Sequence, residues 1–324
     1  MSTGRVRCRA RFPRAPGEAE SWLADSARWD DFEFRSDDIV ISAPVKSGTT
    51  WTQMICALLV FQRADLPAAL TTLSPWLDMR VRPLSAVRAQ LDAQRHRRFI
   101  KTHTPLDGLP GASGVTYIAV GRDPRDVAIS LHHHRANLAR DVVLRYLDEP
   151  STEQSAHPSG IASDERETFL QWMANDDSPL DYQYSLRALI RHQNTAWSRR
   201  NDPSVVLLHY SDLARDLDGE MKRLADRLGI SVAAETWPTL VRAATFSQMR
   251  EHSDQLAPDE RLGLIKDPGK FFRAGTSGGW RNHLTADDLA RYLERLTAEA
   301  SPELIRWLHH GAAGLNGPDS EISA

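Results

Sequence analysis

The feature that most constrains this chain is a short apolar run that passes through a tight polar loop directly into an apolar segment of helical length. Ile39–Ala43 has the length of a buried strand, and Trp51–Phe61 has the length and apolar bias of a helix. Between them stands Pro-Val-Lys-Ser-Gly-Thr-Thr, residues 44–50. A strand that enters a helix through so short a loop is typical of a βα unit, so an α/β fold is expected.

Three later apolar runs also have the length of buried strands. They span residues 98–102, 115–120 and 205–210. The second run leads into a helix opened by Pro124. The third precedes a single helix that Ser211 is expected to cap and Gly229 to end. This alternation predicts an α/β fold with a central, mostly parallel sheet flanked by helices, in a P-loop-like arrangement.

Reactive or anion-binding side chains follow all four expected strands. Lys46, His103, Arg122 and Tyr210 stand at or just after the strand ends. Ligands of parallel sheets bind outside the carboxyl ends of the strands, so these side chains are expected to meet at one edge of the sheet. This convergence of separate segments is the strongest indication of a binding site in the sequence.

Length and charge limit the classes of function. The 324 residues carry a formal net charge of −3, so no overall basic field favours nucleic acid, and any anion site must be local. We expect one domain over residues 21–315, a basic disordered tail at 1–20 and a short disordered tail at 316–324. The two cysteines, Cys8 and Cys56, fit a reducing, cytoplasmic compartment, and no apolar run is long enough to span a bilayer.

The loop Lys46–Thr50 has the chemistry of an anion site. A helix N-terminus leaves backbone N–H groups unpaired and carries positive potential. Gly48 lets the backbone approach an anion closely, while the hydroxyls and Lys46 add further donors. A plain strand-to-helix turn is the alternative that these residues alone leave open. The loop is not a Walker A motif, because the lysine precedes the glycine and no earlier glycine opens the loop.

Three other segments carry weaker signals. His103, in Lys-Thr-His, could take a proton from an attacking hydroxyl, although a histidine at a strand end often has only a structural role. Arg122 offers planar donors to a phosphate, and Ser130 follows about two helical turns later, but local pairing of Arg122 with aspartates is equally open. The glycine-rich loop after Arg273 can wrap a phosphate or form an ordinary turn.

Two further regions lie outside these anion-binding segments. Three consecutive histidines, His132–His134, look like a metal-binding tract. However, adjacent helical residues point in different directions and no cysteine or carboxylate stands at zinc-ligand spacing, so no metal is expected. The polar segment 141–179 is expected to be a mobile excursion with one short helix near 165–173, and to act as a lid on the substrate side.

Taken together, these segments resemble the cytosolic-type sulfotransferases that use 3′-phosphoadenosine 5′-phosphosulfate (PAPS). The family's 5′-phosphosulfate loop reads K-S-G-T-T-W, which Lys46–Trp51 match in full. Its K-T-H is matched by Lys101–His103, and its R-[ND]-P-x-D, with a serine further on, by Arg122–Asp126 and Ser130. Its C-terminal R-K-G-x-x-G-D-W segment corresponds to the residues that begin at Arg273.

The resemblance implies a sulfotransferase fold and an enzyme that transfers a sulfuryl group from PAPS to a hydroxyl, with adenosine 3′,5′-bisphosphate as product. His103 is implied as the general base, with Lys46 and Lys101 facing the transferring group, and no metal is implied. The donor-binding residues that it implies are Lys46, Ser47, Gly48, Thr49, Thr50, Trp51, Arg122, Ser130, Tyr210, Phe246, Met249, Arg273, Ala274 and Gly275.

The chain also departs from the family pattern. Ala274 replaces a lysine and Gly279 replaces an aspartate, so one contact to the 3′-phosphate is in question. The dimerisation signature of the animal enzymes is not intact, which leaves the oligomeric state open. Segments 71–76 and 99–109 are similar to mycobacterial members of the family.

The sequence constrains the acceptor less than it constrains the donor. Trp76 and its apolar neighbours suit an apolar or aromatic acceptor, and both a small molecule and a glycolipid could supply the hydroxyl. Two other functions compete with sulfuryl transfer. The order of lysine and glycine disfavours a P-loop phosphotransferase that uses ATP and Mg²⁺. The intact Lys46, Lys101 and His103 disfavour a catalytically inactive nucleotide-binding protein of the same fold.

Overall fold

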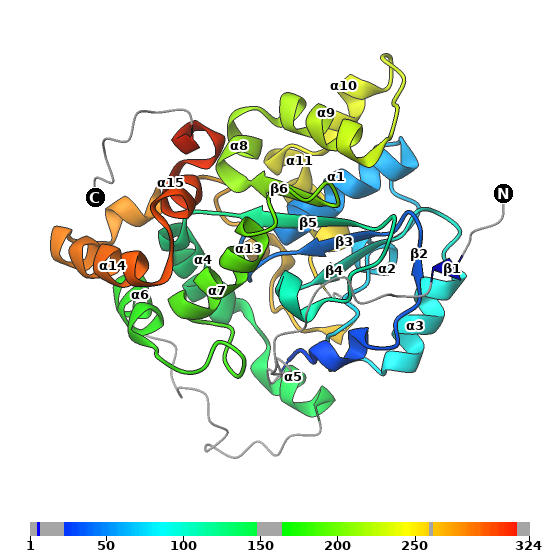
Figure 1. The fold of residues 1–324 in the computed structure, drawn as a ribbon. Coiled ribbons are helices and arrows are strands. Elements are labelled where there is room, and N and C mark those ends of the chain that lie inside the picture. The colour runs from blue at the N-terminus through cyan, green and yellow to red at the C-terminus, as the bar shows by residue number, and fades with distance from the viewer. Residues whose placement is uncertain (1–4, 7–22, 148–163, 259–261, 316–324) are drawn as a thin grey trace.

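The centre of the protein is a four-stranded parallel sheet with the strand order β4-β3-β5-β6 (Figure 1). The computed structural model describes residues 5–6, 23–147, 164–258 and 262–315. All four strands coincide with apolar runs that predicted them, so the parallel α/β fold is confirmed. They are β3 (Ile39–Ser42), β4 (Phe99–Thr102), β5 (Thr116–Gly121) and β6 (Val205–His209).

Helices cover both faces of the sheet. Ile39 and Ile41 of β3 face one apolar layer, and Val40 between them faces the other. The first layer includes side chains of α1 (Thr49–Phe61) and α9 (Leu217–Leu228). The second includes side chains of α3 (Leu84–Ala93) and α7 (Leu186–Trp197). Burial on both faces explains why the strands read as unbroken apolar runs rather than as alternating patterns.

Further helices complete the shell, and α4 packs against α6, α7, α14 and α15 in a third apolar cluster. In chain order the remaining described elements are β1 (Arg5–Val6), β2 (Phe34–Arg35), α2 (Leu70–Leu73), α4 (Pro124–Asn137), α5 (Arg140–Tyr146), α6 (Glu165–Ala174), α8 (Tyr210–Arg215), α10 (Trp237–Ala243), α11 (Phe246–Glu251), α12 (Ser253–Leu256), α13 (Pro268–Phe271), α14 (Ala286–Glu299) and α15 (Pro302–His310). Short 3-10 turns lie at η1 (Ser26–Trp29), η2 (Leu106–Gly108), η4 (Gly279–Asn282) and η5 (Gly311–Leu315).

One predicted helix is two helices. The single helix expected from Ser211 to the end of α9 was wrong, because the chain bends at Asp216 and forms α8 and α9. The Asp216 carboxylate caps α9 by accepting the N–H of Gly219. Ser211 lies inside α8, and the cap is the side chain of His209, which accepts the N–H of Ser211. Gly229 ends α9 in the left-handed conformation, as predicted.

The expected tails and lid are only partly described. In the N-terminal segment, β1 pairs antiparallel with β2, and the other residues of 1–20 lie outside the described part, as do 316–324. Within 141–179, α6 confirms the short helix, α5 was not predicted, and residues 148–163 lie outside the described part. Among the helices that the structure describes, none combines the length and apolarity needed to cross a membrane.

Candidate active site

A pocket with a volume of about 180 Å³ lies where the four strands end. It gathers every donor-binding and catalytic residue that the sequence predicted except Ser47, which is fully buried. The lining residues among them are Lys46, Gly48, Thr49, Thr50, Trp51, Lys101, His103, Arg122, Ser130, Tyr210, Phe246, Met249, Arg273, Ala274 and Gly275. The predicted convergence on one sheet edge is therefore what the structure contains.

The loop between β3 and α1 presents an uncapped helix N-terminus. Gly48 is the N-cap residue with φ of 106°, and no side chain caps the first N–H groups of this helix of 13 residues. Lys46 also has a positive φ, 65°, which costs a residue other than glycine on the order of 1–3 kcal/mol and is typical of functional sites. The Ser47 hydroxyl is buried without a hydrogen-bond partner among the described residues. These unpaired donors suit a bound phosphate.

Arg122 joins this loop to two other segments of the pocket. Its Nη1 donates to the carbonyl oxygen of Lys46 at 2.9 Å, and its Nη2 lies 3.4 Å from the carbonyl oxygen of Thr276. The guanidinium carbon lies 4.1 Å from the ring centroid of Tyr210. The Nε of Arg122 is buried without a hydrogen-bond partner in the described chain, so one donor stays available to an anion.

Two aspartates after Arg122 have structural roles that the sequence did not reveal. Oδ2 of Asp126 accepts the N–H of Gly278 at 2.7 Å and so holds the glycine-rich C-terminal loop against the start of α4. Asp123 pairs with Arg125, with 2.9 Å between Oδ2 and Nη2. The local Arg–Asp pairing that the sequence left open therefore holds for Arg125, and Arg122 makes its contacts elsewhere.

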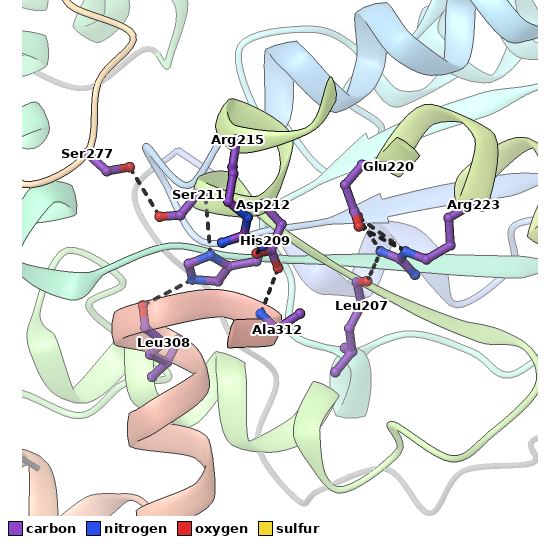
Figure 2. Close-up of polar contacts among 10 residues, drawn as sticks. All are labelled: Leu207, His209, Ser211, Asp212, Arg215, Glu220, Arg223, Ser277, Leu308 and Ala312. Carbon is purple, nitrogen blue, oxygen red and sulfur yellow. Dashed lines mark hydrogen bonds and ion pairs between the residues drawn. The ribbon is translucent and has the colours of Figure 1, made fainter. Parts of the chain in front are cut away.

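Contacts around His209 hold the C-terminal helix to the end of β6 (Figure 2). Nε2 of His209 donates to the carbonyl oxygen of Leu308 at 3.0 Å, because its Nδ1 already accepts a backbone N–H. Oδ2 of Asp212 accepts the N–H of Ala312 at 2.8 Å. The start of α8, where Tyr210 lines the pocket, is thereby fixed from the C-terminal side.

Aromatic and glycine residues shape the side of the pocket opposite the catalytic strand end. Trp51 donates from Nε1 to the carbonyl oxygen of Ala244 at 2.8 Å, and its ring lies edge-on to Tyr210 with 5.2 Å between centroids. Gly275 has φ of 67°, and a Cβ there would lie 2.3 Å from Cγ of Phe246. A side chain at Gly275 would therefore displace the Phe246 ring, so this close approach requires glycine.

His103 is positioned as a proton acceptor. Its Nδ1 lies 2.6 Å from the carbonyl oxygen of Ala43, and because a carbonyl only accepts, Nδ1 carries the proton and Nε2 keeps a lone pair. Burial, followed by the positive charge of Lys101, lowers the pKa of His103 well below its ordinary value. The Trp76 ring lies edge-on to the imidazole at 4.7 Å and takes Nζ of Lys101 over its face at 4.3 Å. A neutral imidazole can accept a proton at Nε2, and the lowered pKa makes it a weaker base than a free histidine.

A buried carboxylate holds the backbone on both sides of His103. Oδ2 of Asp78 accepts the hydroxyls of Thr102 and Thr104, each at 2.5 Å. The Thr104 N–H in turn donates to Oγ1 of Thr102 at 2.9 Å. Asp78 and Thr102 are completely buried. Sequence reasoning missed Asp78, because no periodic pattern or motif connects it to the strand end that it stabilises.

Positive charge is concentrated beside His103. Burial, and then the charges of Arg122, Lys101 and Arg273, lower the pKa of Lys46 to about 7. The Nζ of Lys46 lies 4.3 Å from the ring centroid of Phe271. A bound polyanion would relieve the repulsion among these cations and raise the pKa of Lys46 again. The pocket is therefore electrostatically matched to a ligand with several negative charges.

A family model described as "Sulfotransferase domain" matches residues 36–303. This chain belongs to the sulfotransferase family. A glycolipid sulfotransferase of Mycobacterium bovis (strain BCG / Pasteur 1173P2) is 43% identical to it over 309 residues, which are 91% of this chain and 94% of that protein. A glycolipid sulfotransferase of Mycobacterium tuberculosis (strain ATCC 25177 / H37Ra) is 42% identical over 308 residues, with the same coverage. The predicted likeness to mycobacterial members is confirmed.

Solved structures confirm the sulfotransferase fold. Retinol dehydratase in complex with androsterone and the inactive cofactor PAP has a TM-score of 0.63 at 23% identity, over 84% of this chain and 83% of that chain. Mouse sulfotransferase SULT7A1 complexed with PAP has a TM-score of 0.61 at 22% identity, over 90% of this chain and 91% of that chain. The prediction of an enzyme that transfers a sulfuryl group is likewise confirmed by the family.

The remaining side of the sulfotransferase pocket is mostly apolar. Its lining includes Leu23, Met79, Ile129, Leu138, Val143, Leu264 and Ile265. His134 from α4 also lines it, with its ring 6.2 Å from that of Phe271 and its Nδ1 buried without a hydrogen-bond partner among the described residues. Trp76 lines the pocket as predicted. The place of His134 was not predicted, because a histidine tract alone does not show which member faces a ligand.

Proposed function

We propose that this sulfotransferase takes its sulfuryl group from PAPS. Two of its structural neighbours were solved with PAP, and the polar groups of this pocket suit such a ligand. The helix N-terminus after Gly48 is uncapped, and the Ser47 hydroxyl and the Arg122 Nε are buried without partners among the described residues. Buried polar groups are normally satisfied, and phosphate oxygens would satisfy these. When bound, the donor supplies the sulfuryl group, and adenosine 3′,5′-bisphosphate is the part that departs.

The proposed roles in the transfer follow from the tautomer of His103. Its Nδ1 is committed to the Ala43 carbonyl oxygen at 2.6 Å, and this single contact supports the assignment of Nε2 as the atom that takes the proton of the acceptor hydroxyl. Lys46 and Lys101 supply positive charge beside it, where charge develops on the oxygen that bridges to the departing phosphate. We propose that no metal takes part in this step.

The proposed acceptor is a glycolipid hydroxyl. Two relatives that are 43% and 42% identical and cover 91% of this chain are named glycolipid sulfotransferases. The apolar side of the pocket offers a surface for a lipid chain. The buried Nδ1 of His134 lacks a partner in the described chain and offers a hydrogen bond to a second hydroxyl of a sugar. A simple phenol or sterol would leave this group unsatisfied.

A His103→Ala variant tests the general base. Turnover should fall by at least ~10², the magnitude of general-base catalysis, while adenosine 3′,5′-bisphosphate still binds. Single-turnover kinetics with labelled PAPS and calorimetry with the bisphosphate measure the two quantities. His252→Ala, at an exposed histidine far along the chain in α11's C-cap, is the matched control. Near-normal turnover in His103→Ala would remove His103 from the mechanism, and an unmodified chain that fails to bind the bisphosphate would refute the donor.

A transfer screen tests the acceptor. Labelled PAPS should be offered with a long-chain glycoside, the same sugar without its chain, and the same chain as a simple alcohol. We expect the intact glycoside to show the highest kcat/KM, because it fills the apolar side and also reaches His134. Preference for the simple alcohol would refute the glycolipid acceptor, and it would not bear on the proposed donor or general base.

We also propose a cytoplasmic location. The proposal rests on the sparse cysteines, of which Cys56 is a buried free thiol. Burial raises the pKa of that thiol to about 12, so it is an unreactive core residue. Cell fractionation with antibody detection measures the location directly.

A further inference from the structure

Two histidines and a glutamate converge outside the pocket. His132 and His133 of α4 and Glu165, the first residue of α6, each offer one ligand atom, and these atoms lie within 4.8 Å of one another. Nε2 of His133 lies 3.2 Å from Oε1 of Glu165. None of the three residues lines the sulfotransferase pocket, so the group is separate from the donor and acceptor sites.

Hydrogen bonds around His132 leave one of its nitrogens ready for a ligand. The Thr168 hydroxyl donates its proton to the carbonyl oxygen of Asp164 at 3.1 Å. It can therefore only accept from Nδ1 of His132, which lies 2.7 Å away. His132 thus carries its proton on Nδ1, and Nε2 keeps a lone pair. Metal-binding histidines are oriented in this way, with the second nitrogen held by a neighbouring oxygen.

The contact of 3.2 Å between His133 and Glu165 is an ion pair only when His133 is protonated. Nε2 of His133 is buried and makes no hydrogen bond that meets normal geometry with the described residues. The second oxygen of Glu165 lies 3.8 Å from Nδ1 of His283, which follows η4. Arg273 is the nearby cation whose charge reaches His133, and it opposes a metal at this place. The carboxylate of Glu165 offsets that charge.

We propose that His132, His133 and Glu165 form a binding site for Zn²⁺ or a similar late first-row divalent cation. Two imidazoles and one carboxylate are donors that such ions prefer, whereas Mg²⁺ and Ca²⁺ prefer oxygen ligands alone. His283, whose Nδ1 lies 3.8 Å from Oε2 of Glu165, is a candidate for a further ligand. The cation would join α4 to the start of α6 and so brace the helix that carries Ser130, with no part in the transfer step.

Calorimetry on the untagged, metal-stripped full chain tests this site. Zn²⁺ should bind with one ion per chain. His132→Ala, His133→Ala and Glu165→Gln should each abolish or greatly weaken that binding. Thr168→Val keeps the volume but loses the oxygen that orients His132, and it should weaken binding by about 10–100-fold. His134→Leu is the matched control, because it removes the third histidine of the same tract, which is not in the group.

Cobalt provides a measurement that does not depend on stability. Co²⁺ added to the stripped chain should give visible ligand-field absorption that His133→Ala loses and His134→Leu keeps. Circular dichroism of the apo variants shows that they are folded. The proposal fails if the unmodified chain binds no Zn²⁺ in one-to-one stoichiometry. It also fails if His134→Leu loses as much affinity as His133→Ala, because binding would then belong to the tract as a whole.

Discussion

Nη1 of Arg122 lies 2.9 Å from the carbonyl oxygen of Lys46, so the arginine after β5 holds the loop that follows β3. The two residues meet because β3 and β5 are adjacent parallel strands, with Ile41 paired to Ile118 and Ser42 to Ala119. The anion-binding groups are thereby assembled before a ligand arrives. Preorganisation of this kind reduces the entropy that binding would otherwise cost.

Arg122→Lys should weaken binding of adenosine 3′,5′-bisphosphate by about 10–100-fold. Lysine cannot keep the carbonyl contact to Lys46 and also supply a donor where Nε of Arg122 lies. Hydrogen bonds to charged groups contribute about 1.5–3 kcal/mol. Calorimetry measures the affinity. Adenosine 5′-monophosphate is the control ligand, and its affinity should fall much less. If both nucleotides lost affinity equally, Arg122 would act by holding the loop at Lys46 and not by binding the 3′-phosphate.

The pH dependence of kcat/KM for PAPS should follow the titration of Lys46, whose pKa is about 7 in the free protein. The protonated amine binds an anion better, so kcat/KM for PAPS should be highest below pH 7 and fall by up to about tenfold per pH unit above it. A bound polyanion raises the pKa of Lys46, so the alkaline limb of kcat should lie at higher pH. Because the pKa of His103 is well below 6.5, no acid limb is expected near 6.5.

A Lys46→Arg variant provides the check on that assignment. Arginine stays charged across the accessible pH range, so the alkaline limb of kcat/KM should disappear even if the rate itself falls. Steady-state kinetics from pH 5.5 to 9.5 with PAPS as the varied substrate make the measurement. A limb at the same pH in both proteins would assign it to another group.

Asp78→Ala should lower kcat by about 10–100-fold and leave the affinity for the bisphosphate nearly unchanged. The carboxylate holds Thr102 and Thr104, and a displacement of about 1 Å at His103 between them has an effect of this size on rate. Asp78→Asn retains an acceptor oxygen and should recover part of the rate. A parallel loss of kcat and of bisphosphate affinity would show that Asp78 supports the whole pocket rather than the base.

Removal of one partner from the buried pair Arg98–Asp38 should strongly destabilise the sheet. Nε of Arg98 donates to Oδ1 of Asp38 at 2.8 Å, and the two side chains are 1% and 0% exposed. Asp38→Ala leaves a buried charge unpaired and should lower the free energy of unfolding by about 3–5 kcal/mol, measured in urea. The double variant Arg98→Met/Asp38→Leu should be more stable than Asp38→Ala alone. A double variant no more stable than Asp38→Ala would contradict the cost assigned to the unpaired charge of Arg98.

The sequence was sufficient to predict the strands and the convergence of the proposed donor-binding residues on one edge of the sheet. Buried parallel strands such as Ile39–Ser42 read as apolar runs because both of their faces are covered. The loop residues from Lys46 to Trp51 are contiguous and match the family motif in full, and this resemblance removed the alternative of a plain turn that the residues alone left open. His103 follows from the rule that ligands bind beyond the carboxyl ends of parallel strands, and Lys101 from the match to the family's K-T-H.

Long-range partners were beyond reach of the same reasoning. Asp78 lies in a segment without periodicity, and its hydroxyl partners are identified only by tertiary packing. Glu165 stands far from His132 and His133 along the chain, so ligand spacing could not connect them. The break at Asp216 was missed because aspartate is tolerated inside helices as well as at their caps.

Two hydrogen bonds, from His209 to Leu308 and from Ala312 to Asp212, have a consequence for folding during synthesis. The loop near residue 46 is made before the strand end that carries Tyr210, and the residues that secure this strand end come 99 and 100 positions later in the chain. On the ribosome, a growing chain can pair β3, β4 and β5 well before α15 has left the exit tunnel. We therefore expect a chain that stalls before α15 has left the tunnel not to bind nucleotide.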